Sequence, residues 1–167
     1  MTEERTIRTL TADLSDTHDS AYVVPRQFNS YGAYEECLGP IDTVSTSDDN
    51  SLVSKALKGP GDGRILVVEN SGSTECSMVG GDLARAAYDN GWVGIIVNGA
   101  IRDIVELREV PMGIFALASC PCKSVKRGIG ARGEPMRFVN FDVRPGDVAA
   151  ADPDGVIVIA ADDFKGI

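Results

Sequence analysis

Histidine is almost absent from this sequence of 167 residues, and aromatic residues make up only 6% of it. The one histidine, His18, stands in the polar stretch 16–19, far in sequence from any candidate nucleophile, which argues against a Ser-His-Asp or Cys-His enzyme. One residue separates Cys120 from Cys122, whereas neighbouring zinc ligands are usually separated by two or more. We therefore expect no zinc site and interpret the four cysteines as reduced structural thiols.

Long hydrophobic runs and positive charge are also scarce. No apolar run approaches the roughly 20 residues that span a bilayer, and residues 1–5 lack the apolar core of a signal peptide, so we predict a cytoplasmic protein. The formal net charge is -9, which argues against nucleic-acid binding. The one basic cluster, Lys123, Lys126 and Arg127, has no interleaved aromatic residues, and we interpret it as a solvated loop.

The length and the spacing of apolar residues predict one α/β domain spanning residues 1–167, with a mixed, layered sheet. Four-residue and five-residue apolar runs bounded by glycine or polar residues indicate buried strands, and three-to-four-residue apolar spacing indicates helices. The expected helices are residues 11–16, 50–57, 82–90 and 104–109; the expected strands are 65–68, 93–97, 113–119, 138–143 and 155–159; residues 27–39 are irregular or strand-like, and 98–99 and 145–147 are turns.

The strand, helix and strand between residues 65 and 97 form a crossover unit. If the strands are parallel, their carboxyl ends lie along one sheet edge, where α/β proteins usually bind ligands. A nine-residue helix runs back about 13 Å and a five-residue strand returns about 16 Å, so the chain after Val97 comes back close to the start of the helix. Residues 80–83 and 99–103 should therefore meet.

The two segments together offer groups that suit a small anion. Gly80 and Gly81 precede a helix whose first backbone N–H groups attract a carboxylate, and Arg102 and Asp103 add a guanidinium and a carboxylate. A structural interpretation is equally open at this point: Asp103 caps the next helix with Glu106 in a capping box, Arg102 pairs with Glu106, and Asp82 caps its own helix.

At these residues the chain resembles the family that contains 4-hydroxy-4-methyl-2-oxoglutarate aldolases and the regulator of ribonuclease activity A. The family signature is a glycine, twenty residues, Arg-Asp, two more residues and an acid, here Gly81, Arg102, Asp103 and Glu106. The resemblance covers most of the chain and is carried by residues 78–84, 90–103, 48–52, 63–68, 123–126, 145–147 and 152–156.

This resemblance implies a β/β/α layered fold of the swivelling type, assembled as a homotrimer. It implies a magnesium or manganese ion bound by Asp103, with Asp82 approaching the metal through water, and a catalytic Arg102 that contacts the substrate. The backbone of Gly80, Gly81, Asp82 and Leu83 holds the substrate carboxylate. The implied activity is a metal-dependent lyase that forms the enolate of pyruvate, by cleaving 4-hydroxy-4-methyl-2-oxoglutarate and by decarboxylating oxaloacetate, both 2-keto acids.

The alternative is a protein regulator that binds and inhibits ribonuclease E without catalysis, since an acidic surface can meet a basic partner segment. Family members without the aspartate at position 103 lose their metal ligand, and this chain retains both Arg102 and Asp103, which favours the lyase. A methyltransferase of menaquinone synthesis is disfavoured because the Gly80-Gly81 loop lacks the strand-Gly-x-Gly geometry of a nucleotide site.

Overall fold

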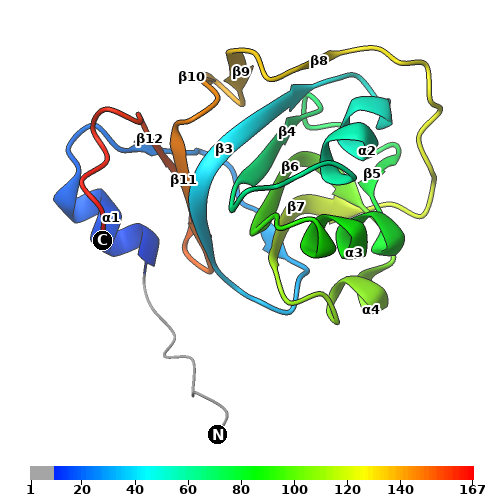
Figure 1. The fold of residues 1–167 in the computed structure, drawn as a ribbon, viewed down its shortest axis with the longest axis horizontal. Coiled ribbons are helices and arrows are strands. Elements are labelled where there is room, and N and C mark those ends of the chain that lie inside the picture. The colour runs from blue at the N-terminus through cyan, green and yellow to red at the C-terminus, as the bar shows by residue number, and fades with distance from the viewer. Residues whose placement is uncertain (1–9) are drawn as a thin grey trace, which may run out of the picture.

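A computed structural model describes residues 10–167, which form a mixed α/β structure around one extended sheet (Figure 1). The helices of this part of the chain are α1 (Leu10–Thr17), α2 (Ser51–Leu57), α3 (Gly81–Asp89) and α4 (Ile104–Leu107). Its strands are β1 (Tyr22–Val23), β2 (Asn29–Ser30), β3 (Cys37–Ser45), β4 (Ile65–Glu69), β5 (Ser77–Val79), β6 (Gly94–Ile101), β7 (Gly113–Ser119), β8 (Ala131–Arg132), β9 (Met136–Phe138), β10 (Phe141–Val143), β11 (Val148–Asp152) and β12 (Gly155–Ile159).

The long, curved strand β3 belongs to both halves of the large sheet (Figure 1). Its first residues pair antiparallel with β11, and its later residues, from Ile41 to Ser45, pair parallel with β4. The main path runs β1-β12-β11-β3-β4-β6-β7-β2, with β5 added to β6 and β8 to β3, while β9 and β10 form a separate hairpin. Strands β3, β4, β6 and β7 are parallel neighbours, so their carboxyl ends share one edge.

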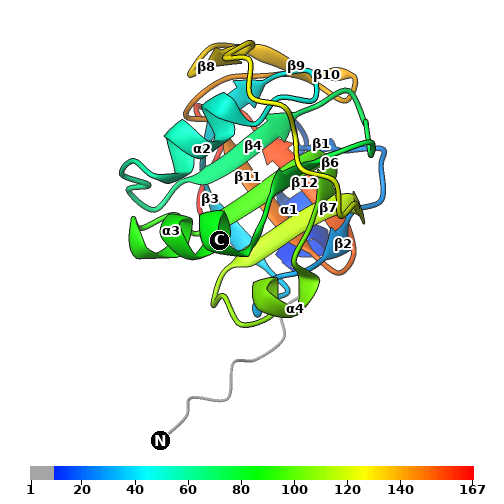
Figure 2. The same ribbon diagram turned by 90° about the vertical axis from the view of Figure 1, so that its right-hand side faces the viewer.

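Both faces of the parallel strands are covered, which explains why residues 65–68 of β4 form an unbroken apolar run. Leu66 and Val68 point into a core that they share with residues of α2 and α3. Ile65 and Val67 point the other way, into a second core with β9 to β12. Figure 2 shows α2 and α3 lying across one face of these strands. Apolar packing on both faces of the sheet therefore fixes the carboxyl ends of the parallel strands.

The predicted α/β fold with a mixed sheet is confirmed, and so is the parallel crossover from β4 through α3 to β6. Helix α3 ends where expected, because Gly91 follows its C-cap with a φ of 85°, a left-handed conformation that glycine adopts without strain. The swivelling-type layering, the trimer, the single domain and the cytoplasmic location stay predictions. Residues 1–9 of the predicted polar arm lie outside the described residues.

Several predicted boundaries were wrong. Strand β6 does not end in a turn at Asn98-Gly99 but continues to Ile101, because β5 pairs with its last residues. The predicted strand 138–143 is a hairpin of β9 and β10, with Val139 in a left-handed conformation between them. Helix α4 stops at Leu107, two residues early. Strands β5 and β11 and the length of β3 were missed.

Within residues 10–167, no helix is long and apolar enough to cross a membrane.

Asp49 is a buried carboxylate that joins two distant segments next to the start of α2. It accepts hydrogen bonds from the backbone N–H groups of Ser51 (2.8 Å), Arg127 (2.6 Å) and Ile129 (3.3 Å). Burial raises the pKa of this carboxyl, but the hydrogen bonds outweigh that effect and hold the pKa well below its usual range. Asp49 therefore anchors the loop that follows β7.

We expect Asp49→Asn to lower the free energy of unfolding by about 2 kcal/mol near neutral pH, since hydrogen bonds to a charged acceptor contribute roughly 1.5–3 kcal/mol. Because the folded-state pKa is depressed, this stabilisation is present above the unfolded-state pKa of about 3.9 and is lost as the pH falls through the folded-state value. Urea denaturation should show the wild-type advantage narrowing below about pH 4. Asp16→Asn, on the exposed side of α1, is the control; an advantage that stays constant on acidification would contradict the assignment.

Candidate active site

The first turn of α3 presents unpaired backbone donors. Strand β5 leads into Gly80, the N-cap residue, whose backbone is extended and which makes no side-chain cap. Asp82 is exposed in the first turn and does not cap its own helix, so that structural interpretation is excluded. Within residues 10–167, the N–H groups of Asp82 and Leu83 have no hydrogen-bond partner, and such groups at a helix N-terminus can meet an anion.

The chain returns to this point at the end of β6. The backbone N–H of Arg102 donates to the carbonyl oxygen of Val79 at 3.0 Å, which ties the segment after β6 to the end of β5. Asp103 Oδ2 accepts a hydrogen bond of 2.9 Å from the backbone N–H of Gly81, the first residue of α3. The predicted meeting of residues 80–83 with residues 99–103 is confirmed.

Asp103 has an unusual backbone, with φ 62° and ψ 45°, which is rare for residues other than glycine. It stands at the N-cap position of α4, yet its side chain makes no cap hydrogen bond there. The carboxylate crosses to α3 instead, so the capping-box interpretation of Asp103 with Glu106 is wrong. Arg102 Nε lies 4.0 Å from Asp103 Oδ2, which makes Asp103 its ion-pair partner.

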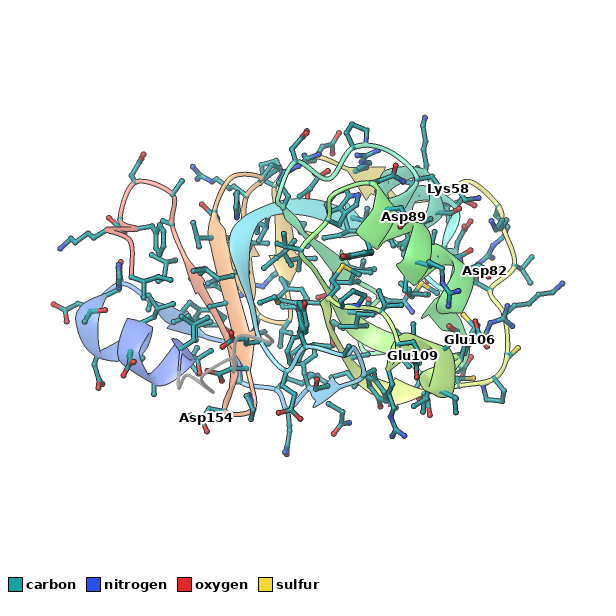
Figure 3. The ribbon with its side chains drawn as sticks, turned by 60° about the horizontal axis from the view of Figure 1, so that its bottom comes forward. Lys58, Asp82, Asp89, Glu106, Glu109 and Asp154 are labelled. Atoms are coloured by element: carbon teal, nitrogen blue, oxygen red, sulfur yellow. The ribbon has the colours of Figure 1, made fainter. Side chains whose placement is uncertain are left out.

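Both glycines leave room for acidic side chains that pack against the backbone. A Cβ on Gly80 would lie 2.7 Å from Asp103 Oδ2, and a Cβ on Gly81 would overlap the carboxylate of Glu106. Figure 3 shows Asp82 on α3 and Glu106 on α4 on the same side of the molecule. The glycine pair thus lets two carboxylates approach the helix N-terminus closely.

These residues line a cleft of about 270 Å³, a volume that suits a small organic acid rather than a nucleotide. All six residues predicted for the site contribute to its walls: Gly80, Gly81, Asp82, Leu83, Arg102 and Asp103. The structure brings together every predicted site residue, and their chemical roles stay predictions.

Sequence reasoning missed the opposite wall of the cleft. Asn50 and Ser124 form its hydrogen-bonded base: Ser124 Oγ donates to Asn50 Oδ1 at 2.7 Å and accepts from the Asn50 backbone N–H at 3.1 Å. Lys58, Lys123 and Lys126 also line the cleft. The loop of Lys123 and Lys126 is exposed, as predicted, but two of its three basic side chains face the cleft. The sequence signal for this wall was the family resemblance, which includes residues 48–52 and 123–126.

The donor set fits a magnesium or manganese ion. Oδ2 of Asp103 is held by Gly81, and the side chain is 39% exposed, which leaves its carboxylate accessible from the cleft. No group of three His, Cys, Asp or Glu side chains within residues 10–167 could enclose a metal. Magnesium keeps several waters and needs only one or two protein carboxylates, so Asp103 and Asp82, the two carboxylates that line the cleft, are the residues that could hold it.

Two cysteines flank the site without taking part in a disulfide. The carbonyl of Pro121, between Cys120 and Cys122, accepts a hydrogen bond of 3.4 Å from Arg102. Burial raises the pKa of the Cys76 thiol to about 11 and that of Cys37 to about 12, which keeps both protonated near neutral pH. All four cysteines are free thiols, as predicted.

The chain is similar to proteins of known family over most of its length. A sequence model of the RraA-like family, described as Aldolase/RraA, matches residues 11–158. A 4-hydroxy-4-methyl-2-oxoglutarate aldolase of Thermus thermophilus is 41% identical over 149 residues, which is 89% of this chain and 91% of that protein.

Two solved structures share the fold closely. The RNA-processing inhibitor RraA from Thermus thermophilus is 40% identical with a TM-score of 0.87, covering 92% of this chain and 93% of the other. A structure from Geobacillus kaustophilus, titled an S-adenosylmethionine:2-dimethylmenaquinone methyltransferase, is also 40% identical, with a TM-score of 0.85 and coverages of 90% and 94%. The sequence match over residues 11–158 and these closely similar folds agree, and the chain belongs to the RraA-like family of aldolase-type and ribonuclease-regulator proteins.

Proposed function

We propose that this protein is a divalent-metal-dependent lyase that cleaves 4-hydroxy-4-methyl-2-oxoglutarate to two molecules of pyruvate and decarboxylates oxaloacetate. The observation that carries the proposal is the hydrogen bond between the Gly81 N–H and Asp103 Oδ2, which holds a carboxylate beside the free end of α3. The names of relatives such as the Thermus thermophilus aldolase support it. The resemblance implies the metal and the decarboxylation, and the carboxylate of Asp103 in the wall of the cleft supports this part of the proposal.

In both reactions the bond between C3 and C4 of a 2-keto acid breaks, and its electron pair is delocalised onto the keto oxygen at C2. The backbone N–H groups at the start of α3 hold the carboxylate at C1, because a helix N-terminus attracts anions. Arg102 places a fixed positive charge beside the oxygen that becomes negative, and such preorganised charge supplies much of the rate enhancement in enzymes. Asp103 would hold a divalent ion, which when bound would supply Lewis-acid chemistry at the keto group.

The retro-aldol reaction makes one further demand, since the proton of the 4-hydroxyl group must be removed. Asp82 is the other carboxylate in the cleft wall, and we assign it the acceptance of that proton through a water molecule. Decarboxylation releases carbon dioxide and has no hydroxyl proton to remove. In both reactions the enolate then takes up a proton at C3 from water to give pyruvate. Both reactions therefore depend on Asp103 and Arg102, whereas the retro-aldol reaction alone needs Asp82 to accept the hydroxyl proton.

Asp103→Asn is expected to lower the turnover of oxaloacetate with magnesium at least about 100-fold, the scale of losing one main electrostatic element. Asn also tolerates the left-handed backbone, so the fold should persist. EDTA should abolish turnover by the wild type, and added magnesium should restore it. The assay is pyruvate formation, with circular dichroism to check the fold. Turnover that is unchanged in EDTA excludes the mechanism.

A second variant tests the position of Asp103 rather than its charge. Gly80→Ala places a Cβ 2.7 Å from Asp103 Oδ2 and so displaces the carboxylate, and it should lower turnover in the same assay. Gly59→Ala is the matched control, because its added Cβ makes an ordinary contact of 3.4 Å.

Asp82→Asn should separate the two reactions. We expect about 100-fold slower cleavage of 4-hydroxy-4-methyl-2-oxoglutarate, within the range that general acid–base catalysis contributes, and less than about threefold change for oxaloacetate. The measurement is kcat for each substrate under the same magnesium concentration. Equal losses on both substrates would show that Asp82 serves the metal or the helix rather than the hydroxyl proton.

A second candidate function is the binding and inhibition of ribonuclease E, which the similarity to the RNA-processing inhibitor RraA favours. The formal net charge of -9 suits a basic segment of such a partner. If the lyase is the whole function, immobilised protein should retain no ribonuclease E at moderate salt. If the wild type and Asp103→Asn retain ribonuclease E equally, the protein has the regulator function in addition to the lyase function. The partner would then bind a surface other than the cleft.

A further inference from the structure

Two cysteines meet where the loop after β7 passes beside β5. Ser77 and Lys123 form a parallel β-bridge there, and the Ser77 backbone N–H donates to the Cys122 carbonyl at 2.8 Å. Cys76 precedes Ser77 and Cys122 precedes Lys123, so the two cysteines are neighbours in the register of this bridge. Two thiols that are far apart in the sequence therefore lie opposite each other.

Cys76 and Cys122 face the side of this segment pair that is turned away from the cleft. Opposite residues of paired strands direct their side chains to the same face, and successive residues alternate between the faces. Ser77 and Lys123 both line the cleft, whereas the two cysteines one position earlier do not. Paired strands lie about 4.8 Å apart, within the roughly 4.4–6.8 Å Cα separation that a disulfide spans. A disulfide between the two cysteines therefore needs little backbone movement.

A third cysteine, Cys120, lies beside the same pair. Its Sγ donates to the Glu75 carbonyl at 3.4 Å, which holds it against the segment that carries Cys76. Burial, the Asp48 carboxylate and the thiols of Cys122 and Cys120 all raise the pKa of the Cys76 thiol, and such an effect between thiols requires that they lie close together. In the part of the chain that the structure describes, no three acidic, histidine or cysteine side chains could enclose a metal ion. The cluster is therefore arranged for thiol chemistry rather than for metal binding.

The two opposed thiols differ in their access to solvent. Cys122 is exposed, whereas Cys76 is only 7% exposed and its Sγ donates to Asp48 Oδ1 at 3.5 Å. A soluble oxidant can therefore reach Cys122 first. The raised pKa of Cys76 keeps its thiol protonated near neutral pH and makes it the slower attacking group. An accessible thiol beside a second cysteine that can resolve it is the arrangement of redox-sensor sites.

The same segment is attached to the cleft on both sides of Cys122. Pro121 precedes it, and the Pro121 carbonyl accepts a hydrogen bond of 3.4 Å from Arg102 Nη1. Lys123 follows it and lines the cleft. A covalent bond at Cys122 therefore acts on the backbone that holds a partner of Arg102.

We propose that Cys76 and Cys122 are a thiol oxidation site, which a soluble disulfide such as oxidised glutathione closes to a protein disulfide that slows the reaction in the cleft. The Cys122 thiolate attacks one sulfur of the oxidant, which forms a mixed disulfide and releases one glutathione thiolate. Cys76 then loses its proton to water, and its sulfur attacks Cys122 Sγ, which forms the protein disulfide and releases the second glutathione thiolate. The protein gives up two protons and two electrons, and the oxidant is reduced to two thiols. The effect on turnover rests on the proposed lyase function, whereas the formation of the disulfide does not.

The disulfide is tested by peptide mass spectrometry of the whole protein after treatment with oxidised glutathione and alkylation of the remaining thiols. We expect a linked pair of peptides that contain Cys76 and Cys122, with Cys37 alkylated. Cys76→Ser should stop the reaction at the mixed disulfide of Cys122, and Cys122→Ser should leave Cys76 reduced. Cys37→Ala is the matched control, because Cys37 lies in the other apolar core, and it should form the disulfide as the wild type does. A Cys120–Cys122 disulfide, a wild type that keeps glutathione on Cys122, or no modification of Cys122 would overturn the site.

The effect on the cleft is measured as oxaloacetate turnover with magnesium, before and after the same oxidation. We expect the oxidised wild type to be about fivefold slower, the scale of one hydrogen bond lost at Arg102, and dithiothreitol to restore the rate. Cys122→Ser should keep its turnover in the oxidant. Full turnover by the disulfide-linked protein would overturn the coupling to the cleft. A disulfide in a protein that shows no turnover even when reduced would uphold the oxidation site and reject the lyase function.

Discussion

The hydrogen bond from the Gly81 N–H to Asp103 Oδ2 organises the site, because it joins the start of a helix to the loop after the next strand. A Cβ on Gly80 would lie 2.7 Å from the same carboxylate oxygen, which would then have to shift. The hydrogen bond needs Asp103 in a left-handed conformation, which costs on the order of 1 kcal/mol for a residue other than glycine. The carboxylate is thereby directed to the cleft instead of to its own helix.

The scaffold makes such a strained arrangement possible. Strand β5 pairs with the last residues of β6, and the Arg102 N–H continues that pairing to Val79, so Asp103 follows directly on a fixed backbone. Beneath it, the parallel strands are buried between two apolar cores. On the far side of the cleft, Asp49 fixes the loop that carries Lys126 through backbone hydrogen bonds at Arg127 and Ile129. Both walls are therefore attached to rigid elements.

The sequence was sufficient to predict the meeting of the two loops, because apolar runs and helix length determine where a parallel crossover returns. It could not decide between a cap and a ligand for Asp103, since both use the same spacing to Glu106, and only the left-handed backbone separates them. The end of β6 was misplaced because Asn98-Gly99 is a common turn pair, and its extension depends on pairing with β5, a contact between distant segments. Lys58 was missed for the same reason: its place in the cleft depends on how α2 packs beside α3.

The distribution of charge bears on which function the fold serves. A surface that only docks a basic partner gains nothing from collecting cations in a small cleft, nor from holding Asp103 in a strained conformation against a helix N-terminus. Such strain persists where the surrounding structure maintains it, and it clusters at ligand sites. The acidic exterior and the cationic cleft can therefore serve different ligands without competing. In the proposed function, a protein partner would meet the outer surface, while a small anion would bind in the cleft beside Arg102 and Asp103.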